Sequence, residues 1–212
     1  MNLLVVGDVH GCFYTFKALL DRYWDPAETV LVQVGDLINK GPYSAECVAF
    51  AMEMAERHGP QFVALRGNHE QLMIDAHREN RRLKAYRDFK EQVKSMDLKY
   101  SRVARWLSAR PLSYERQNLL ISHAGLAKSC PDPFDIRHPE SLINNRQPLQ
   151  NLRSTQVIGH VVLKQDAPFF STRENAWYID TGAYLGRKLT ALFFNGQTQS
   201  KVIEVQTDVR DC

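Results

Sequence analysis

The sequence lacks the features that direct a protein into a membrane or out of the cell. No run of about 20 apolar residues occurs, which excludes a membrane-spanning helix. The first apolar run, residues 3–6, is too short for a signal peptide, and we expect none. The 4 cysteines include no C-x-x-C pair. Reduced thiols in a cytoplasmic protein therefore explain them better than a disulfide framework or a structural zinc site.

A large net charge is also missing. With 27 Lys and Arg against 24 Asp and Glu, the net charge is only +3, so we expect no stable complex with nucleic acid. The apolar content of 44% and charged content of 24% are typical of a soluble globular protein. A chain of 212 residues can bury a substantial core, and we expect one domain over residues 1–212. None of these totals bears on the oligomeric state.

The first part of the chain alternates short apolar runs with amphipathic helical patterns. We expect strands at residues 3–6, 30–34 and 61–65, and helices at residues 12–22 and 43–58. Pro42 marks the start of the second helix, and Gly59-Pro60 marks its end. This alternation favours an α/β fold with a largely parallel sheet.

The later part of the chain predicts a different arrangement. Apolar residues at intervals of three and four predict an almost wholly helical subdomain or insertion at residues 71–110. Strand-like runs without comparable helices between them follow at residues 118–122, 156–158, 176–179, 189–194 and 201–206. Asn195-Gly196 predicts a hairpin between the last two, and residues 130–149 predict a long surface loop. We therefore expect antiparallel strands here, and overall an α/β sandwich of sheets with helices on its outer faces.

Glycine-rich polar clusters follow five of the predicted strands. They read G7-D-V-H-G11, G35-D36, G67-N-H-E70, H123-A-G-L126 and G159-H160. Ligands bind at the carboxyl ends of strands in α/β sheets. We therefore expect six side chains at one edge of the fold, those of Asp8, His10, Asp36, Asn68, His123 and His160. A lone buried histidine is more often an ordinary core residue, but the joint occurrence of these clusters favours a ligand-binding site.

The chemistry of this set favours a pair of divalent metal ions. Three imidazoles, two carboxylates and one amide without a thiolate suit manganese, iron or zinc better than a cysteine-bound structural zinc. Asp8 and His10 lie two residues apart, so in an extended backbone they point to the same side. The two oxygens of Asp36 allow it to bridge both ions. Two ions about 3.5–4 Å apart stabilise the attacking and leaving oxygens of an in-line phosphoryl displacement.

Six short motifs in a fixed order resemble the phosphoprotein phosphatase (PPP) family of metallophosphoesterases. They are GDVHG, GD-x-x-x-K-G, RGNHE, HAGL, GH and DTG, and they run from Gly7 to Gly182. The stretches RGNHEQLMID at 66–75 and YIDTGA at 178–183 are similar to the small bacterial and phage lambda-type Ser/Thr phosphatases. The resemblance implies a single metallophosphoesterase catalytic domain, a β-sandwich with helices packed on its outer faces.

The resemblance also implies roles for individual residues. One metal ion would be held by Asp8, His10 and the bridging Asp36, and the other by Asp36, Asn68, His123 and His160. His69 matches the general acid that protonates the leaving oxygen, and the phosphate-binding positions match Lys40, Asn68 and Arg146. The implied cofactors are two divalent ions, manganese first, with iron, zinc or nickel as alternatives.

One motif departs from the family pattern. Where the family usually has Asp-Arg, this chain has Asn39-Lys40. The Asp orients the catalytic histidine and stabilises its charged form. Asn39 could still accept a hydrogen bond from His69, but it brings no charge, so the imidazolium is less favoured. Lys40 keeps the positive charge and loses the two-pronged geometry of arginine.

This departure leaves three functions open. The overall pattern favours a Ser/Thr phosphoprotein phosphatase. The alternative is a diadenosine-tetraphosphatase-like hydrolase of nucleoside polyphosphates, because a phosphate leaving group needs little protonation and because the N-K-G-P run resembles that branch. The third is a weakly active phosphate-binding module. The partner is accordingly a phosphorylated protein or a nucleoside polyphosphate.

A basic segment lies outside these motifs. Residues 78–110 contain 11 Lys and Arg against 4 Asp and Glu. Such a segment could attract anionic substrates by its field. A solvated helical face is the simpler interpretation.

Overall fold

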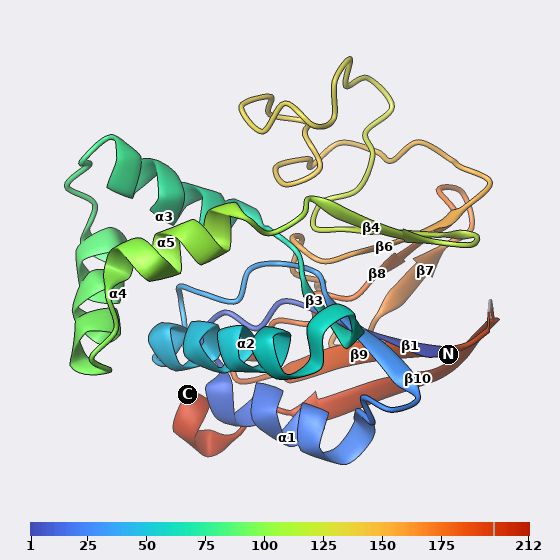
Figure 1. Ribbon diagram of the computed structural model, residues 1–212. Coiled ribbons are helices and arrows are strands. Elements are labelled where there is room, and N and C mark those ends of the chain that lie inside the picture. The colour runs from blue at the N-terminus through green and yellow to red at the C-terminus, as the bar shows by residue number, and fades with distance from the viewer. Residues whose placement is uncertain (197) are drawn as a thin grey trace.

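Two five-stranded β-sheets pack face to face in the computed structural model of the chain, which describes residues 1–196 and 198–212 (Figure 1). The first sheet has the strand order β10-β9-β1-β2-β3. Its strands are β1 (Asn2–Val6), β2 (Thr29–Gln33), β3 (Phe62–Ala64), β9 (Lys188–Asn195) and β10 (Thr198–Gln206). The second sheet has the order β4-β5-β6-β8-β7. Its strands are β4 (Ser113–Arg116), β5 (Leu119–Ser122), β6 (Thr155–Ile158), β7 (Phe169–Ser171) and β8 (Ala176–Tyr178).

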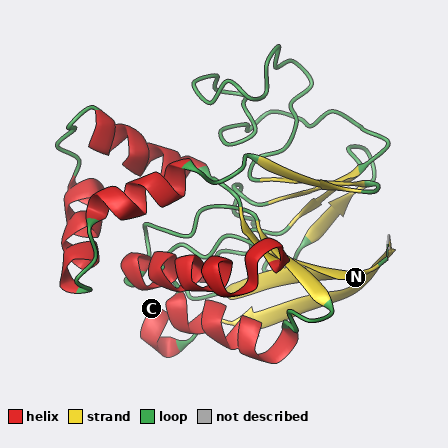
Figure 2. Cartoon of the chain, in the orientation of Figure 1, coloured by secondary structure: helices red, strands yellow, loops and turns green. Residues whose placement is uncertain are grey.

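The helices form two groups, with α1 and α2 against the first sheet and the others beyond α2 (Figure 2). They are α1 (Phe13–Tyr23), α2 (Ser44–His58), α3 (Asn68–Arg78), α4 (Lys84–Ser95) and α5 (Tyr100–Ser108). Three short 3₁₀ turns complete the set, η1 (Gly59–Gln61), η2 (Ala183–Leu185) and η3 (Val209–Asp211). Among the described residues, no helix is both long enough and apolar enough to cross a membrane.

Strand β1 is apolar throughout because both of its faces are buried. Leu3 and Val5 pack between the two sheets, whereas Leu4 and Val6 pack against the helices. The inter-sheet core is continued by Ile121 and other side chains of the second sheet. A strand in the middle of such a layered structure reads as a continuous apolar run. The prediction of a buried strand at residues 3–6 is therefore confirmed.

A loop covers the outer face of the second sheet. Gln156 of β6 points to this face, where its Nε2 donates to the carbonyl of Gln150 at 2.8 Å and its Oε1 accepts from the amide of Leu126 at 2.8 Å. A small cluster around Leu149 and Ile158 packs beside it. The long loop predicted at residues 130–149 thus lies over the second sheet, and the helices cover the outer face of the first.

The prediction of antiparallel strands in the second half is partly wrong. Strands β5, β6 and β8 pair in parallel, and only β4 and β7 pair antiparallel at the edges of their sheet. Parallel pairing needs a long crossover. In this sheet the crossovers are irregular loops and not helices. The absence of helical patterns between the strands therefore did not indicate antiparallel pairing. The short edge strands β4 and β7 were not predicted.

The two other predictions for this half agree better with the structure. The segment 71–109 forms α3, α4 and α5, which are interrupted near Asn80 (φ 52°) and Asp97 (φ 58°). A left-handed residue ends a helix because it turns the chain out of the helical path. The hairpin is confirmed by the antiparallel pairing of β9 with β10. Gly196 takes a φ of 65° there, and Gln197 lies outside the described residues.

The C-terminal residues reach back to the start of α1 (Figure 1). The carboxylate of Asp211 accepts from the amides of Tyr14 at 3.2 Å and Thr15 at 2.8 Å and from the Thr15 hydroxyl at 2.7 Å. No side chain caps α1 from within its own segment. Asp211 therefore supplies the N-terminal cap from the other end of the sequence.

Asp211→Ala should lower the free energy of unfolding by about 3 kcal/mol, because it leaves buried donors without an acceptor. Urea unfolding followed by circular dichroism measures the loss. Asp21→Ala is the matched control, since Asp21 belongs to the same helix and makes an exposed ion pair with Lys17 at 2.6 Å. It should cost less than about 0.5 kcal/mol. Equal losses in the two variants would contradict the capping role.

Candidate metal centre

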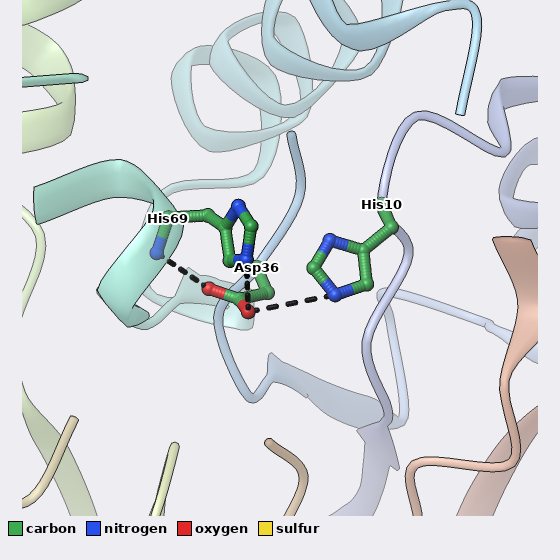
Figure 3. A group of neighbouring side chains, drawn as sticks. All are labelled: His10, Asp36 and His69. Atoms are coloured by element: carbon green, nitrogen blue, oxygen red, sulfur yellow. Dashed lines mark hydrogen bonds and ion pairs between the residues drawn. The ribbon is translucent and has the colours of Figure 1, made fainter. Parts of the chain in front are cut away.

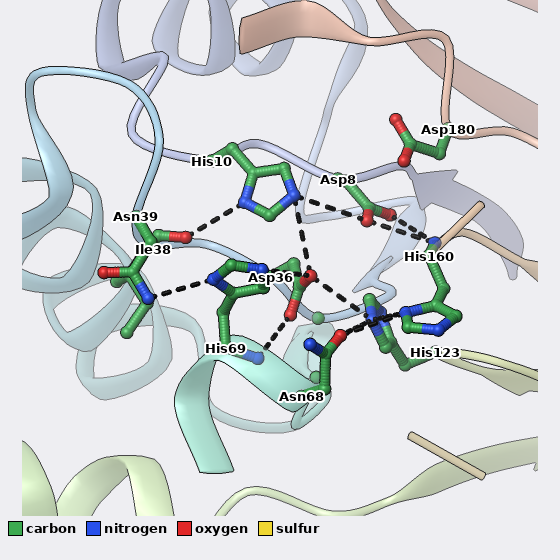
Figure 4. A network of polar contacts seen from close by, with 12 residues as sticks. Asp8, His10, Asp36, Ile38, Asn39, Asn68, His69, His123, His160 and Asp180 are labelled. Atoms are coloured by element: carbon green, nitrogen blue, oxygen red, sulfur yellow. Dashed lines mark hydrogen bonds and ion pairs between the residues drawn. The ribbon is translucent and has the colours of Figure 1, made fainter. Parts of the chain in front are cut away.

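Five strands and the start of one helix bring the predicted ligands together (Figure 4). Asp8 and His10 follow β1, and Asp36 follows β2. Asn68 opens α3 just after β3, while His123 follows β5 and His160 follows β6. The six side chains expected at one edge of the fold thus lie in one cluster, although they come from segments far apart in the sequence.

The carboxylate of Asp36 lies at the centre of the cluster. Its Oδ2 lies 3.5 Å from His10 Nε2, 3.3 Å from His123 Nε2 and 4.0 Å from His69 Nε2. Figure 3 shows the His10 and His69 rings facing this oxygen from two directions. Oδ1 accepts from the backbone amide of His69 at 2.9 Å. Burial would raise the pKa of Asp36, but the facing histidines, His123 first, hold it well below its usual range.

Asp8 and His10 form one side of the cluster. His10 Nδ1 donates to the carbonyl of Ile38 at 3.0 Å, which leaves the Nε2 lone pair facing the carboxylates. Nε2 lies 3.9 Å from Asp8 Oδ2. Asp8 accepts from the backbone amide of His160 at 3.1 Å. Burial lowers the pKa of His10 to about 4, so its imidazole is neutral and able to bind a metal ion near neutral pH.

Asn68, His123 and His160 form the other side. Asn68 Oδ1 lies 3.0 Å from His123 Nε2 and 3.0 Å from His160 Nδ1, and these two nitrogens lie 3.1 Å apart. The opposite ring nitrogens, His123 Nδ1 and His160 Nε2, are buried without a hydrogen-bond partner. Asn68 Oδ1, His123 Nε2 and His160 Nδ1 thus bring several lone pairs together. A bound cation would satisfy these lone pairs better than hydrogen bonds between the three side chains.

Two groups of potential ligand atoms lie close enough together to hold a metal ion. Asp36, His123 and His160 form one group, and His10, Asp36 and His69 form the other, each with ligand atoms within 4.8 Å of one another. His69 thus stands in the second group where Asp8 was expected. Asp36 belongs to both groups, which agrees with a bridging role. The residues present fit two divalent ions.

Excess buried negative charge surrounds this site. Burial and the charge of Asp180 raise the pKa of Asp8 well above its usual range. Burial also raises the pKa of Asp180 to about 6 and that of Glu70 to about 7, with the charge of Asp36 adding to both. Asp180 Oδ2 is buried without a partner. Repulsion among these carboxylates would be relieved by divalent cations between them.

The backbone of the site is strained. Asp36 has a φ of 56°, His10 of 47° and His160 of 67°, and Asn39 and Lys40 take values of 68° and 71°. Non-glycine residues in this left-handed region cost free energy, and they persist where surrounding structure holds them. The glycines beside them serve close approach instead. A Cβ on Gly67 would collide with Asp36 Oδ1, and one on Gly159 would collide with Asp8 Oδ1.

The structure corrects the expected hydrogen bond between Asn39 and His69. Asn39 was expected to accept from the imidazole, but its Nδ2 lies 3.0 Å from His69 Nδ1. An amide nitrogen only donates, so Nδ1 must accept and the ring proton lies on Nε2. Burial lowers the pKa of His69, the charge of Lys40 lowers it further and that of Asp36 opposes both. His69 is therefore a neutral imidazole whose Nε2 proton points into the site.

Two cationic side chains stand at the rim. Lys40 is exposed, and its Nζ lies 4.2 Å from the centre of the Tyr184 ring, which in turn meets His10 edge-on at 5.0 Å. Arg146 is exposed in the loop over the second sheet. Burial, the charge of His123 and that of Arg146 lower the pKa of His160. Both cations thus lie near enough to act on an anion at the cluster.

Sequence reasoning missed the roles of Glu70 and Asp180, although both lie within quoted motifs. Glu70 is fully buried. Its carboxylate accepts from the amides of Asp36 at 2.7 Å, Leu37 at 2.9 Å and Gly67 at 2.8 Å. It therefore holds the strained turn that carries the central carboxylate. The sequence signal that could have found Glu70 was its position directly after the proposed site residues Asn68 and His69.

Two packed sheets with a histidine and carboxylate cluster at the carboxyl ends of strands from both define a metallophosphoesterase. The chain belongs to the family of calcineurin-like phosphoesterases, whose model matches residues 1–187. This finding confirms the family resemblance and the fold class that the motifs predicted, and the family implies divalent metal ions.

Named relatives of two kinds are similar to the chain. It is 31% identical over 210 residues to Serine/threonine-protein phosphatase 1 of Salmonella typhimurium, covering 89% of this chain and 90% of that protein. It is 30% identical over 127 residues to the symmetrical bis(5'-nucleosyl)-tetraphosphatase of Methylococcus capsulatus, but covers only 44% of that protein. A solved protein serine/threonine phosphatase from Saccharomyces cerevisiae matches with a TM-score of 0.68 and 16% identity over 98% of this chain and 80% of the other. That match shows the fold alone.

Glu70→Gln should weaken divalent-metal affinity by about 10- to 100-fold, because an amide cannot accept from three backbone donors and the Asp36 turn loses its anchor. Calorimetric titration of the metal-stripped protein with manganese measures the change. The control is Asp75→Asn, which alters a half-buried carboxylate of the same helix that accepts from Gln71 at 2.9 Å. Asp75→Asn should stay within threefold of the parent protein. Unchanged affinity in the Glu70 variant would contradict the positioning role.

Proposed function

We propose that this phosphoesterase removes phosphate from serine or threonine side chains of proteins. The convergence of histidines, carboxylates and an amide on Asp36 supports metal-dependent hydrolysis. The end-to-end match with Serine/threonine-protein phosphatase 1 supports the substrate class. The chain spans less than half the length of the tetraphosphatases that it matches, which makes them a poorer guide to its whole activity.

In this proposal Asp8, His10 and Asp36 hold one divalent ion, and Asp36, Asn68, His123 and His160 hold the other. Manganese is our first choice, because a set of imidazole, carboxylate and amide ligands without thiolate suits it. Two such ions supply an activated water and neutralise charge on the phosphoryl oxygens. The near absence of solvent around Asp36, which is 2% exposed, strengthens every electrostatic interaction in the site.

The remaining residues bind the phosphate and deliver a proton. Lys40 and Arg146 are exposed cations at the rim that can contact phosphate oxygens, and Asn68, beside the metal ligands, can contact them through its amide nitrogen. His69 is placed to donate its Nε2 proton to the leaving oxygen, since Nδ1 is occupied by Asn39. A neutral imidazole is a weak acid, so the barrier to leaving-group departure is expected to depend on the leaving group.

That dependence supports a second candidate, hydrolysis of nucleoside polyphosphates. A phosphate leaves with a pKa of about 6, judged by the second ionisation of a phosphoester, whereas a serine alkoxide needs full protonation. Asn39 Nδ2 donates to His69 Nδ1, which stabilises the neutral imidazole and disfavours the charged imidazolium. This observation favours a phosphoanhydride over a phosphomonoester. A weakly active phosphate-binding module is the third candidate.

We also propose that residues 1–212 act as one catalytic domain, in which residues 71–110 form a helical subdomain. In support, Val103 and Leu107 pack into the same core as the first sheet. The 4 cysteines are all free, which supports a cytoplasmic location.

Hydrolysis of a phosphoserine peptide and of diadenosine tetraphosphate by manganese-loaded protein tests these candidates. We expect kcat/KM for the peptide to exceed that for the dinucleotide, and chelation to abolish both activities. Phosphate release measures the first reaction and chromatography of the nucleotides the second. A large preference for the dinucleotide would replace the first candidate by the second. Turnover of neither substrate by fully loaded protein would leave only the binding module.

Asn39→Asp should raise kcat for an alkyl phosphate by about tenfold or more, because a carboxylate at Nδ1 stabilises the imidazolium that protonates a poor leaving group. The gain on a phosphoanhydride should be below threefold. Asp tolerates the left-handed backbone of this position, where φ is 68°. The control is Asn39→Asp combined with His69→Asn, which should show no gain. Equal gains on both substrates would count against the leaving-group argument.

A further inference from the structure

A pocket of about 570 Å³ opens between the end of α2, the start of β3 and one face of α5. Figure 1 shows α5 lying over α2 on the side of the first sheet that carries the helices. None of the lining residues belongs to the metal centre. Met52, Phe62 and Trp106 form an apolar floor, and Arg102, Arg105 and Arg110 stand around it. The proposed reaction uses none of these side chains.

The cations of this pocket are available to a ligand. Arg102 and Arg105 are exposed, and neither makes an ion pair or a side-chain hydrogen bond within the part of the chain that the structure describes. Arg110 stacks its guanidinium over the Trp106 ring at 4.2 Å and donates from Nε to the Trp106 carbonyl at 3.0 Å. Glu56 is the single acidic residue of the lining. The pocket therefore favours an anionic partner with apolar groups.

The spacing of the cations along α5 and its end fits an extended peptide. Arg102 and Arg110 are eight residues apart along α5 and its end, which corresponds to about 12 Å at 1.5 Å per residue. Side chains on one face of an extended peptide repeat every ~7 Å. Two or three acidic side chains of such a peptide can therefore meet these cations.

Hydrogen bonds of Arg66 connect the end of α5, which lines the pocket, with the start of α3, which carries Asn68. Arg66, next to the Gly67-Asn68 turn, donates to the carbonyls of Ser108 at 2.9 Å and Arg110 at 3.1 Å at the end of α5. It also donates to Gln71 Oε1 of α3 at 3.0 Å. A ligand held by α5 is thus fixed relative to the helix that carries Asn68 and His69.

We propose that this pocket docks an acidic segment of the phosphoprotein substrate outside the phosphorylated residue itself. Carboxylates of the segment pair with Arg102, Arg105 and Arg110, and an apolar side chain packs on Trp106. The inference rests on the proposed phosphoprotein phosphatase function. It assigns a specific role to part of the basic segment at residues 78–110.

The first test measures binding without catalysis. A fluorescein-labelled peptide of alternating glutamate and leucine, carrying no phosphate, is titrated with the full-length protein and followed by anisotropy. Arg102→Glu combined with Arg105→Glu should weaken binding at least about tenfold, because two attractions become repulsions. The matched control is Lys94→Glu combined with Lys99→Glu. These lysines are exposed in the same basic segment but do not line the pocket, and their loss should change the Kd by less than about threefold.

Equal weakening in the two double variants would show a diffuse field and overturn the proposal. Failure of the peptide to bind, together with direct binding of a fluorescent ATP analogue that the arginine double variant weakens, would identify a nucleotide site instead and would overturn it too. Because both arginines are exposed, we expect both variants to fold, and circular dichroism checks this.

The second test measures turnover. Two phosphoserine peptides are compared, one with the acidic segment and one with glutamine in place of each glutamate. The ratio of their kcat/KM values, acidic over neutral, should fall about tenfold in the arginine double variant and stay the same in the lysine double variant. An unchanged ratio in both variants would overturn docking during catalysis. Failure of the proposed function is distinguishable, since neither phosphopeptide would then be hydrolysed whereas the unphosphorylated peptide would still bind.

Discussion

The functional edge of this protein depends on one buried carboxylate that several segments hold in place. Asp36 is surrounded by His10, His69 and His123, and its own backbone amide is bound by Glu70. Taking such a carboxylate out of water is costly unless cations or donors compensate it. The imidazoles, the amide of His69 and the implied metal ions provide that compensation. Glu70 in turn fixes the turn by which Asp36 reaches the cluster.

This constraint explains why the site departs from ordinary backbone geometry. Asp36, His10 and His160 take left-handed conformations because their side chains must converge from strands that end side by side. Gly67 and Gly159 are required for a different reason, since any side chain there would occupy the space of the carboxylates. Strain and close approach are tolerated here because the layered core on both faces of β1 stabilises the scaffold.

The same arrangement separates the chemistry of the reaction from the choice of substrate. The chain belongs to the calcineurin-like phosphoesterases, and its named relatives include both a protein phosphatase and a bis(5'-nucleosyl)-tetraphosphatase. The rim differs from the family pattern at Asn39 and Lys40, the residues that our proposal links to acid strength and phosphate contacts. The pocket beside Trp106 would add recognition away from the reacting phosphorus. In this proposal, substrate preference is a property of the rim and the helices.

The sequence by itself determined the elements whose patterns are local. The apolar run of β1, the break after α2 and the β9–β10 hairpin depend on burial, on Gly59-Pro60 and on Asn195-Gly196. The clustering of the six candidate ligands was equally readable, because each lies a few residues after a strand and strand ends meet at one edge. Only the tertiary structure decided the parallel pairing of β5, β6 and β8, the anchoring of the Asp36 turn by Glu70 and the side of Asn39 that faces His69. Those features depend on contacts between residues far apart in the sequence, and such contacts produce no periodic pattern of apolar residues.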